Sequence, residues 1–248
     1  MPDWSYRTFL RPLLGALGAE RGRRVAVRAL RRIGRTRGGG ALIDFLGHMR
    51  ADERLRVRVG GVELAGPVVL GATLDPRGEA LAALSRFGVG LVEVGPVTRD
   101  NVDEIARNLE EANVPVAIRL GDTDLVPRLE PHATLFVVDT KERLDAVKST
   151  RPIALRVTED ALPVTNALTI AGGVRDPEDA KRLLDAGADL VAIDEGILTS
   201  GPGLPKRCNE ALLSTMPSTN QPEPLTLDAA RRAWFWALVL GVAMFAGG

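Results

Sequence analysis

The clearest pattern along the chain is a strand, a helix and a second strand within residues 67–98. Val68 to Gly71 form an apolar run, and a turn at Asp75 to Gly78 follows it. The apolar residues after the turn repeat at the spacing of one helical face: Ala80, Leu81, Leu84 and Phe87. A second apolar run, Leu91 to Val94, comes next. Two short buried strands joined by one helix must run parallel.

The alternation of strand and helix signals continues to residue 213. Further strands are predicted at Val116 to Leu120, Leu135 to Val138, Ile153 to Val157, Leu168 to Ala171 and Leu190 to Ile193. Helices are predicted at Val102 to Ala112, Asp124 to Leu129, Lys141 to Lys148, Pro177 to Ala186 and Pro205 to Leu213. This regularity predicts an α/β fold, a shortened (β/α)8 barrel of the TIM type.

The predicted barrel is short. Pro67 to Pro205 spans 139 residues, whereas such a barrel typically takes about 250. We therefore expect one βα unit to be shrunken or missing between Val157 and Leu168, with an unpaired sheet edge there. A small hairpin, Leu55 to Val59 and Val62 to Leu64, is predicted to precede the barrel.

Charge divides the chain unevenly. Its formal net charge is zero, yet residues 1–60 contain fourteen Arg against five acids, a charge of +9. An amphipathic, Arg-rich helical extension is predicted over residues 1–50, because aromatic and Leu residues occur before position 18 and eight Arg occur in residues 21–37. We expect this extension to bind membrane lipid rather than nucleic acid. The alternative is a solvated basic helix packed on the barrel. Gly38 to Gly40 are interpreted as a flexible joint.

The composition changes again after the barrel, which is assigned to residues 51–215. Residues 216–228 are predicted to be a linker, and residues 229–248 a transmembrane helix, because sixteen uncharged residues follow Arg231-Arg232. The alternative is a helix that docks on a partner. The expected partner is an integral membrane protein that contacts four aromatic residues: Trp234, Phe235, Trp236 and Phe245. The barrel is expected on the cytoplasmic side of the membrane.

Several of these segments resemble the quinone-linked class of dihydroorotate dehydrogenases. The resemblance is carried by Gly71-Ala72-Thr73, by Glu93 to Thr98, and by Thr169 to Val174 with the following Asp176 to Ala180. Tyr6 to Leu14 also looks like the family's N-terminal extension, which touches the membrane and forms the quinone entrance. The resemblance implies a barrel that binds FMN.

The residues that the resemblance places at an FMN site are Ala72, Thr73, Arg156, Gly172, Gly173 and Gly196. Gly172 and Gly173 are expected to let backbone N–H groups approach a phosphate, the alternative being a tight turn. Pro76 and Pro96 replace a Lys and a Thr of the family, and Asp194-Glu195-Gly196 replaces its Tyr-Thr-Gly turn. The two carboxylates are expected to repel a phosphate.

No catalytic base remains in a matching position, and no metal site is expected. The sequence therefore supports two hypotheses. The first is a pseudoenzyme without a cofactor that serves as a membrane-bound accessory or structural subunit of a membrane protein complex. The second is an FMN-dependent, quinone-reducing dihydroorotate dehydrogenase or a related oxidoreductase.

Overall fold

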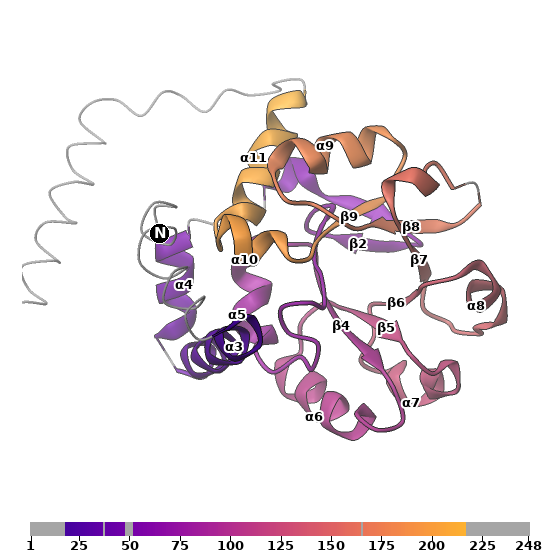
Figure 1. Ribbon diagram of the computed structural model, residues 1–248, viewed down its shortest axis with the longest axis horizontal. Helices are drawn as coiled ribbons and strands as arrows, with labels where there is room; N and C mark the ends of the chain where they lie inside the picture. The colour runs from indigo at the N-terminus through magenta and orange to yellow at the C-terminus, as the bar shows by residue number, and fades with distance from the viewer. Residues whose placement is uncertain (1–17, 37, 48–51, 165, 217–248) are drawn as a thin grey trace, which may run out of the picture. The chain divides into compact units, whose positions relative to one another are not determined.

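A computed structural model of the chain describes residues 18–36, 38–47, 52–164 and 166–216. Seven parallel strands follow one another in sequence order, and the last pairs with the first to close a barrel (Figure 1). The strands are β3 (Val68–Leu70), β4 (Leu91–Val97), β5 (Val116–Leu120), β6 (Leu135–Val138), β7 (Ile153–Val157), β8 (Leu168–Ala171) and β9 (Leu190–Ile193). The predicted α/β barrel is confirmed, and β5 to β9 have the predicted bounds.

Helices fill the connections after most strands. They are α5 (Leu81–Leu84), α6 (Val102–Ala112), α7 (Val126–Leu129), α8 (Lys141–Ala146), α9 (Pro177–Asp185), α10 (Gly196–Ser200) and α11 (Leu204–Thr215). Short 3-10 turns complete the connections: η2 (Glu53–Leu55), η3 (Ser85–Phe87), η4 (Thr123–Leu125) and η5 (Glu159–Ala161). Local caps explain several boundaries, since Thr140 caps α8 and Asp176 forms a capping box with Asp179 at α9.

The connection between β7 and β8 is the shortened one, as predicted, because η5 is the only helical turn in its described residues. The expected unpaired edge in this region is wrong. β7 and β8 pair in parallel over four residue pairs, from Ala154 with Leu168 to Val157 with Ala171. The seven strands close the barrel, so every barrel strand has two neighbours even though the connection between β7 and β8 is short.

The predicted hairpin is present as β1 (Val57–Val59) and β2 (Val62–Leu64), paired antiparallel. Its buried residues Val59 and Leu64 belong to the same apolar cluster as the residues that line the barrel interior, among them Val69, Leu91 and Ile170. The hairpin therefore packs against residues of the barrel interior.

Among the described residues, two helices precede the hairpin, α3 (Ala19–Arg35) and α4 (Gly39–Gly47). Val27 of α3 is buried in the core cluster that surrounds the barrel, and Leu30 packs against that cluster. The flexible joint expected at Gly38 to Gly40 is wrong, because α4 begins at Gly39. A Cβ on Gly39 would lie 1.7 Å from the carbonyl oxygen of Ile33, so the glycine permits a tight turn between two helices.

Within the described residues no helix has both the length and the apolar character needed to cross a membrane. The predicted membrane segment at residues 229–248, its four aromatic contacts, the linker after Met216 and the first seventeen residues lie outside the described part of the chain. They stay predictions.

Candidate functional site

A ring of charged residues and glycines lies at the carboxyl ends of the barrel strands. Each member lies two positions after an apolar residue of the barrel interior. Because side chains of a strand alternate between its two faces, each member is on the same face of its strand as that interior residue. Glu93 follows Leu91, Arg156 follows Ala154, and the other members are Gly71, Arg119, Asp139, Gly172 and Asp194. All seven strands contribute one residue. This period of two is the sequence signal that could have located the ring, and it was missed.

Glu93 is the centre of the ring. Its side chain has 0% exposure, and it accepts from Arg119 Nε at 2.7 Å and from Arg156 Nη1 at 2.6 Å. Burial raises the pKa of Glu93, while Arg156 and Arg119 oppose that rise. A carboxylate held by two guanidinium groups is compensated for its loss of water by charge-assisted hydrogen bonds.

Arg156 joins Glu93 to Asp194. Its Nη2 donates to both carboxylate oxygens of Asp194, at 2.7 and 2.6 Å, and its side chain is only 11% exposed. The guanidinium group therefore donates hydrogen bonds to two carboxylates, Glu93 on β4 and Asp194 just after β9. Arg119 also lies 3.9 Å from Asp139, so the network reaches the more exposed rim at β6.

The Asp194 carboxylate occupies a hollow made by two glycines. A Cβ on Gly71 would lie 2.1 Å from its Oδ1, and a Cβ on Gly172 would lie 3.1 Å from its Oδ2. The backbone N–H of Gly173, which has a φ of +97°, also donates to Oδ2 over 3.4 Å. A side chain at Gly71 would therefore displace the carboxylate and one at Gly172 would crowd it, whereas at Gly173 it is the positive φ that favours glycine.

A pocket of about 770 Å³ opens beside the ring. It is bordered by the loops after β6, β7 and β8, and Arg156, Gly172, Gly173 and Asp194 lie in its wall. The volume is in the range of about 300–1,000 Å³ that small-molecule sites occupy. Among the described residues, no group of three or more His, Cys, Asp or Glu side chains is arranged to hold a metal ion.

The structure brings three of the six sequence-predicted site residues together, namely Arg156, Gly172 and Gly173. Ala72 is buried, and Thr73 beside it is exposed. Gly196 begins α10 and packs below the loop after β8, where a Cβ would lie 2.2 Å from the carbonyl oxygen of Val174. Gly196 therefore serves close packing and is absent from the pocket wall. Sequence reasoning missed Glu93 and Arg119 as members of the site.

The residues present do not fit FMN as arranged. The Gly173 N–H and the Arg156 guanidinium group, which are the donors expected to receive the flavin, are directed at Asp194. The space beside Gly71 and Gly172, which lack side chains, is filled by the Asp194 carboxylate. A phosphate brought to this hollow would meet a negative charge before it met a donor.

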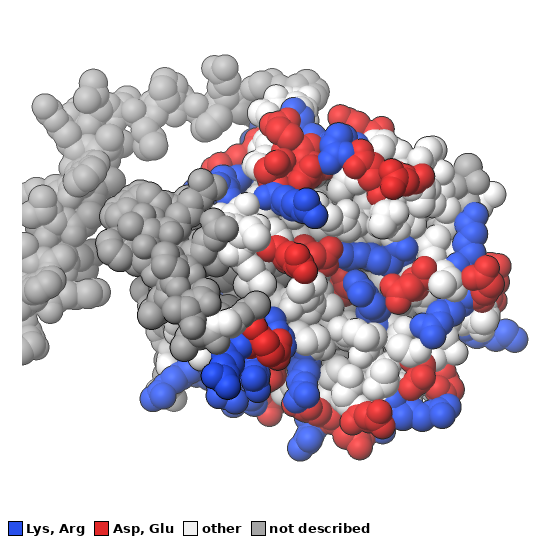
Figure 2. All heavy atoms as spheres, in the orientation of Figure 1, with Lys and Arg blue, Asp and Glu red and all other residues white. Residues whose placement is uncertain are grey.

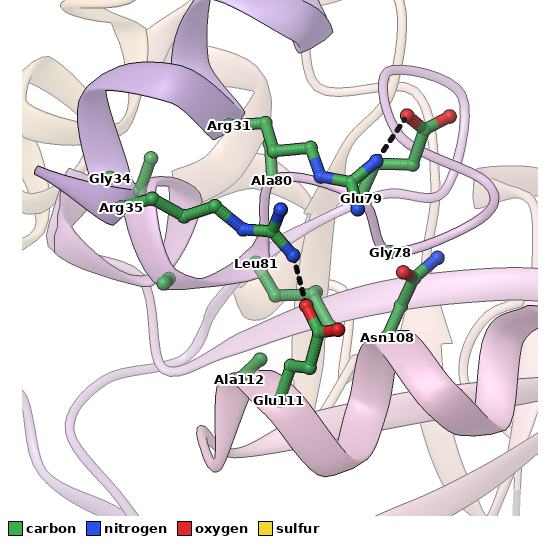
Figure 3. A pocket seen from close by; sticks show the side chains of 12 residues that line it. Arg31, Gly34, Arg35, Gly78, Glu79, Ala80, Leu81, Asn108, Glu111 and Ala112 are labelled. Carbon is green, nitrogen blue, oxygen red and sulfur yellow. Dashed lines mark hydrogen bonds and ion pairs between the residues drawn. The ribbon is translucent and has the colours of Figure 1, made fainter.

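A second, smaller pocket lies between α3 and the barrel; Tyr6 to Leu14, the segment that the resemblance links to a quinone entrance, lies outside the described residues. The volume of this pocket is about 80 Å³. Arg31 of α3 pairs with Glu79 at 3.4 Å, and Arg35 pairs with Glu111 of α6 (Figure 3). In Figure 3 these two side chains reach across the space between the helix and the barrel. Ion pairs therefore close this space to well below the size of ordinary ligand sites.

Comparison with known proteins gives partial relatives. No protein-family model matches the chain. A quinone dihydroorotate dehydrogenase of Deinococcus deserti is 41% identical over 93 residues, which cover 38% of this chain and 26% of the relative. The enzymes of Alkalilimnicola ehrlichii and Thermobifida fusca are 41% and 38% identical and are covered to 25% and 24%. The match thus spans about a quarter of the length of these relatives.

Solved structures share the fold. The ferulenol complex of dihydroorotate dehydrogenase from Eimeria tenella superposes with a TM-score of 0.57 at 13% identity, over 70% of this chain and 90% of that one. The ligand-free enzyme of the same organism gives a TM-score of 0.54 at 15% identity, over 71% and 93%. At such identities the superposition establishes the barrel fold alone.

Proposed function

We propose that this chain, a relative of the quinone-linked dihydroorotate dehydrogenases, is a pseudoenzyme that serves as a membrane-bound accessory or structural subunit. One observation carries the proposal. Arg156, which stands where the related family has a Lys beside the flavin, is held by Glu93 and Asp194 over distances of 2.6–2.7 Å. A guanidinium group whose Nη1 and Nη2 are already directed at two carboxylates has fewer donors left for a flavin.

The alternative function, an FMN-dependent quinone reductase, is favoured by the pocket of about 770 Å³ beside Gly172 and Gly173. Flavin content separates the two functions directly.

The test is the absorbance spectrum of the purified full-length chain, recorded before and after denaturation. We expect no flavin bands and no flavin in the denatured supernatant, and no reduction of a quinone by dihydroorotate. The quinone dihydroorotate dehydrogenase of Deinococcus deserti, purified in parallel, controls for loss of flavin during preparation. Flavin at one equivalent per chain would overturn the proposal.

Attachment to a membrane is proposed to begin at α3. Its exposed face carries Arg residues at positions 21, 24, 28, 32 and 35, with Val25 and Ala29 between them. Figure 2 shows Lys and Arg side chains gathered over this helix. Among the described residues, Arg28 and Arg32 have no carboxylate partner, so their charges are available to lipid phosphates. The apolar residues Val27 and Leu30 face the barrel core, so the barrel holds the arginine face outward.

Binding of the full-length chain to vesicles tests this attachment. We expect more binding to phosphatidylcholine vesicles that contain phosphatidylserine than to phosphatidylcholine alone, because anionic lipid attracts the arginines. The double substitution R28Q/R32Q should remove most of that difference, and high salt should reduce it. R58Q/R107Q removes the same charge from exposed sites outside α3 and serves as the control. An equal effect of both double substitutions would contradict the role of α3.

The proposed subunit also requires a partner. The predicted partner is an integral membrane protein bound through the four aromatic residues at positions 234, 235, 236 and 245, which lie outside the described residues. This part of the proposal rests on the sequence pattern alone.

A further inference from the structure

The hollow around Asp194 has the composition of an anion-binding site. It combines a guanidinium fork from Arg156, a backbone N–H from Gly173 and two positions, Gly71 and Gly172, where the absence of a side chain admits a ligand. Arginine forks and glycine-loop N–H groups are the donors that proteins direct at carboxylates and phosphates. Three separate strand ends supply these groups, and all of them meet at one carboxylate.

We infer that the carboxyl end of this barrel is an anion site whose permanent occupant is the side chain of Asp194. The site would accept a small carboxylate or a phosphate group once that side chain is removed. This inference deepens the proposed function and rests on it, because it explains why a flavin phosphate finds no place.

Charge balance around the hollow supports the inference. Glu93 and Asp194 together neutralise Arg119 and Arg156. Removing the Asp194 carboxylate leaves the two guanidinium groups with Glu93 and with Asp139, which is 3.9 Å from Arg119, so the charge of Arg156 beside the open pocket is less well compensated. A buried guanidinium group that has lost one of its two carboxylate partners is costly, so the variant gains stability from any anion that restores the second pairing.

The covalent attachment of Asp194 decides which ligand the unaltered chain holds. A carboxylate attached to the end of β9 is presented to Arg156 at a high effective concentration, which for short tethers reaches the millimolar range or above. A free phosphate group must therefore compete with a ligand that cannot diffuse away. Occupation by Asp194 is the resting state of the unaltered chain.

The test is rescue of a D194A variant by an added anion. Alanine keeps the Cβ, so formate replaces the missing carboxylate group. We expect D194A to unfold at a lower temperature than the unaltered chain, and we expect formate or inorganic phosphate to raise its unfolding midpoint in a saturable way. Sodium chloride at equal ionic strength should raise it much less. If D194A is unfolded without anion, recovery of its near-ultraviolet circular dichroism on addition of formate is the same readout.

Two variants separate a site from a general salt effect. D194N keeps the hollow filled with a neutral side chain, so formate should not stabilise it. E195A removes a carboxylate from the exposed neighbouring residue and should behave like the unaltered chain. Equal stabilisation of all variants by formate would overturn the inference, and so would a D194A variant indifferent to both anions. If the unaltered chain is colourless but neither formate nor phosphate stabilises D194A, this inference alone is contradicted. Bound flavin in the unaltered chain contradicts the proposed function.

Discussion

Glu93 offers the sharpest test of the ring, because it is the most deeply buried charge in it. The substitution E93Q keeps the shape of the side chain and removes its charge. The amide retains one acceptor oxygen and turns an NH2 group toward the second guanidinium group. Arg119 and Arg156 then share only Asp194 and the distant Asp139 as carboxylate partners.

The expected magnitude follows from burial. Breaking a fully buried ion pair by removing one partner costs about 3–5 kcal/mol. Arg119 is 23% exposed and Arg156 is 11% exposed, so water compensates part of the loss and we expect about 3 kcal/mol. For a chain of this size that corresponds to a fall of roughly 6–12 °C in the unfolding midpoint.

The assay is equilibrium unfolding of the full-length chain in urea near neutral pH. E63Q is the matched control, because Glu63 pairs with Arg56 at 2.9 Å while the two side chains are 63% and 54% exposed. An exposed pair of this kind contributes at most about 1 kcal/mol. If E93Q destabilises the chain no more than E63Q does, the charged network makes no special contribution to the fold, and the reasoning is refuted.

Two further predictions concern single contacts. G71A should destabilise the chain by about 1–3 kcal/mol in thermal unfolding, because its Cβ would lie 2.1 Å from Asp194 Oδ1. G66A, whose Cβ would approach nothing closer than 3.7 Å, should be nearly neutral, and an equal effect of the two substitutions would contradict the close approach. Hydrogen bonds from Ser149 and Thr150 lower the pKa of Glu130, so its stabilising effect is present above the ordinary Glu pKa and is lost as pH falls through the lowered value. The stability difference between the unaltered chain and E130Q should therefore shrink in acid, and a difference independent of pH would contradict this account.

The strands were predictable because their signal is local. Leu190 to Ile193 is an apolar run, and Val116 to Leu120 is apolar except for Arg119; turn residues bound both, and their bounds in the structure agree with the prediction. α6 was equally clear, because its apolar residues repeat with a helical period and Asn113 ends it in a left-handed conformation. Barrel closure was not predictable in this way. It depends on the tilt and stagger of all the strands together, which no single segment encodes.

The site was only partly predictable for a related reason. Arg156 and the two glycines were identified by resemblance, one position at a time. The pairing of Arg156 with Asp194 joins residues 38 positions apart and exists only because the strand ends meet on a closed ring. That Asp194 repels a phosphate stays a prediction. The sequence did not indicate that its carboxylate lies against Gly71 and Gly172 and pairs with Arg156.

The energetics of that location make Asp194 the residue on which both functional hypotheses depend. Two like charges about 4 Å apart repel by about 4 kcal/mol at an effective dielectric constant of 20. A phosphate group beside Gly172 and Gly173 would meet that repulsion and would also break the contacts of 2.6 and 2.7 Å between Asp194 and Arg156. Under the proposed function, a flavin phosphate reaches this position only if Asp194 leaves the hollow, so the contacts between Asp194 and Arg156 oppose its binding.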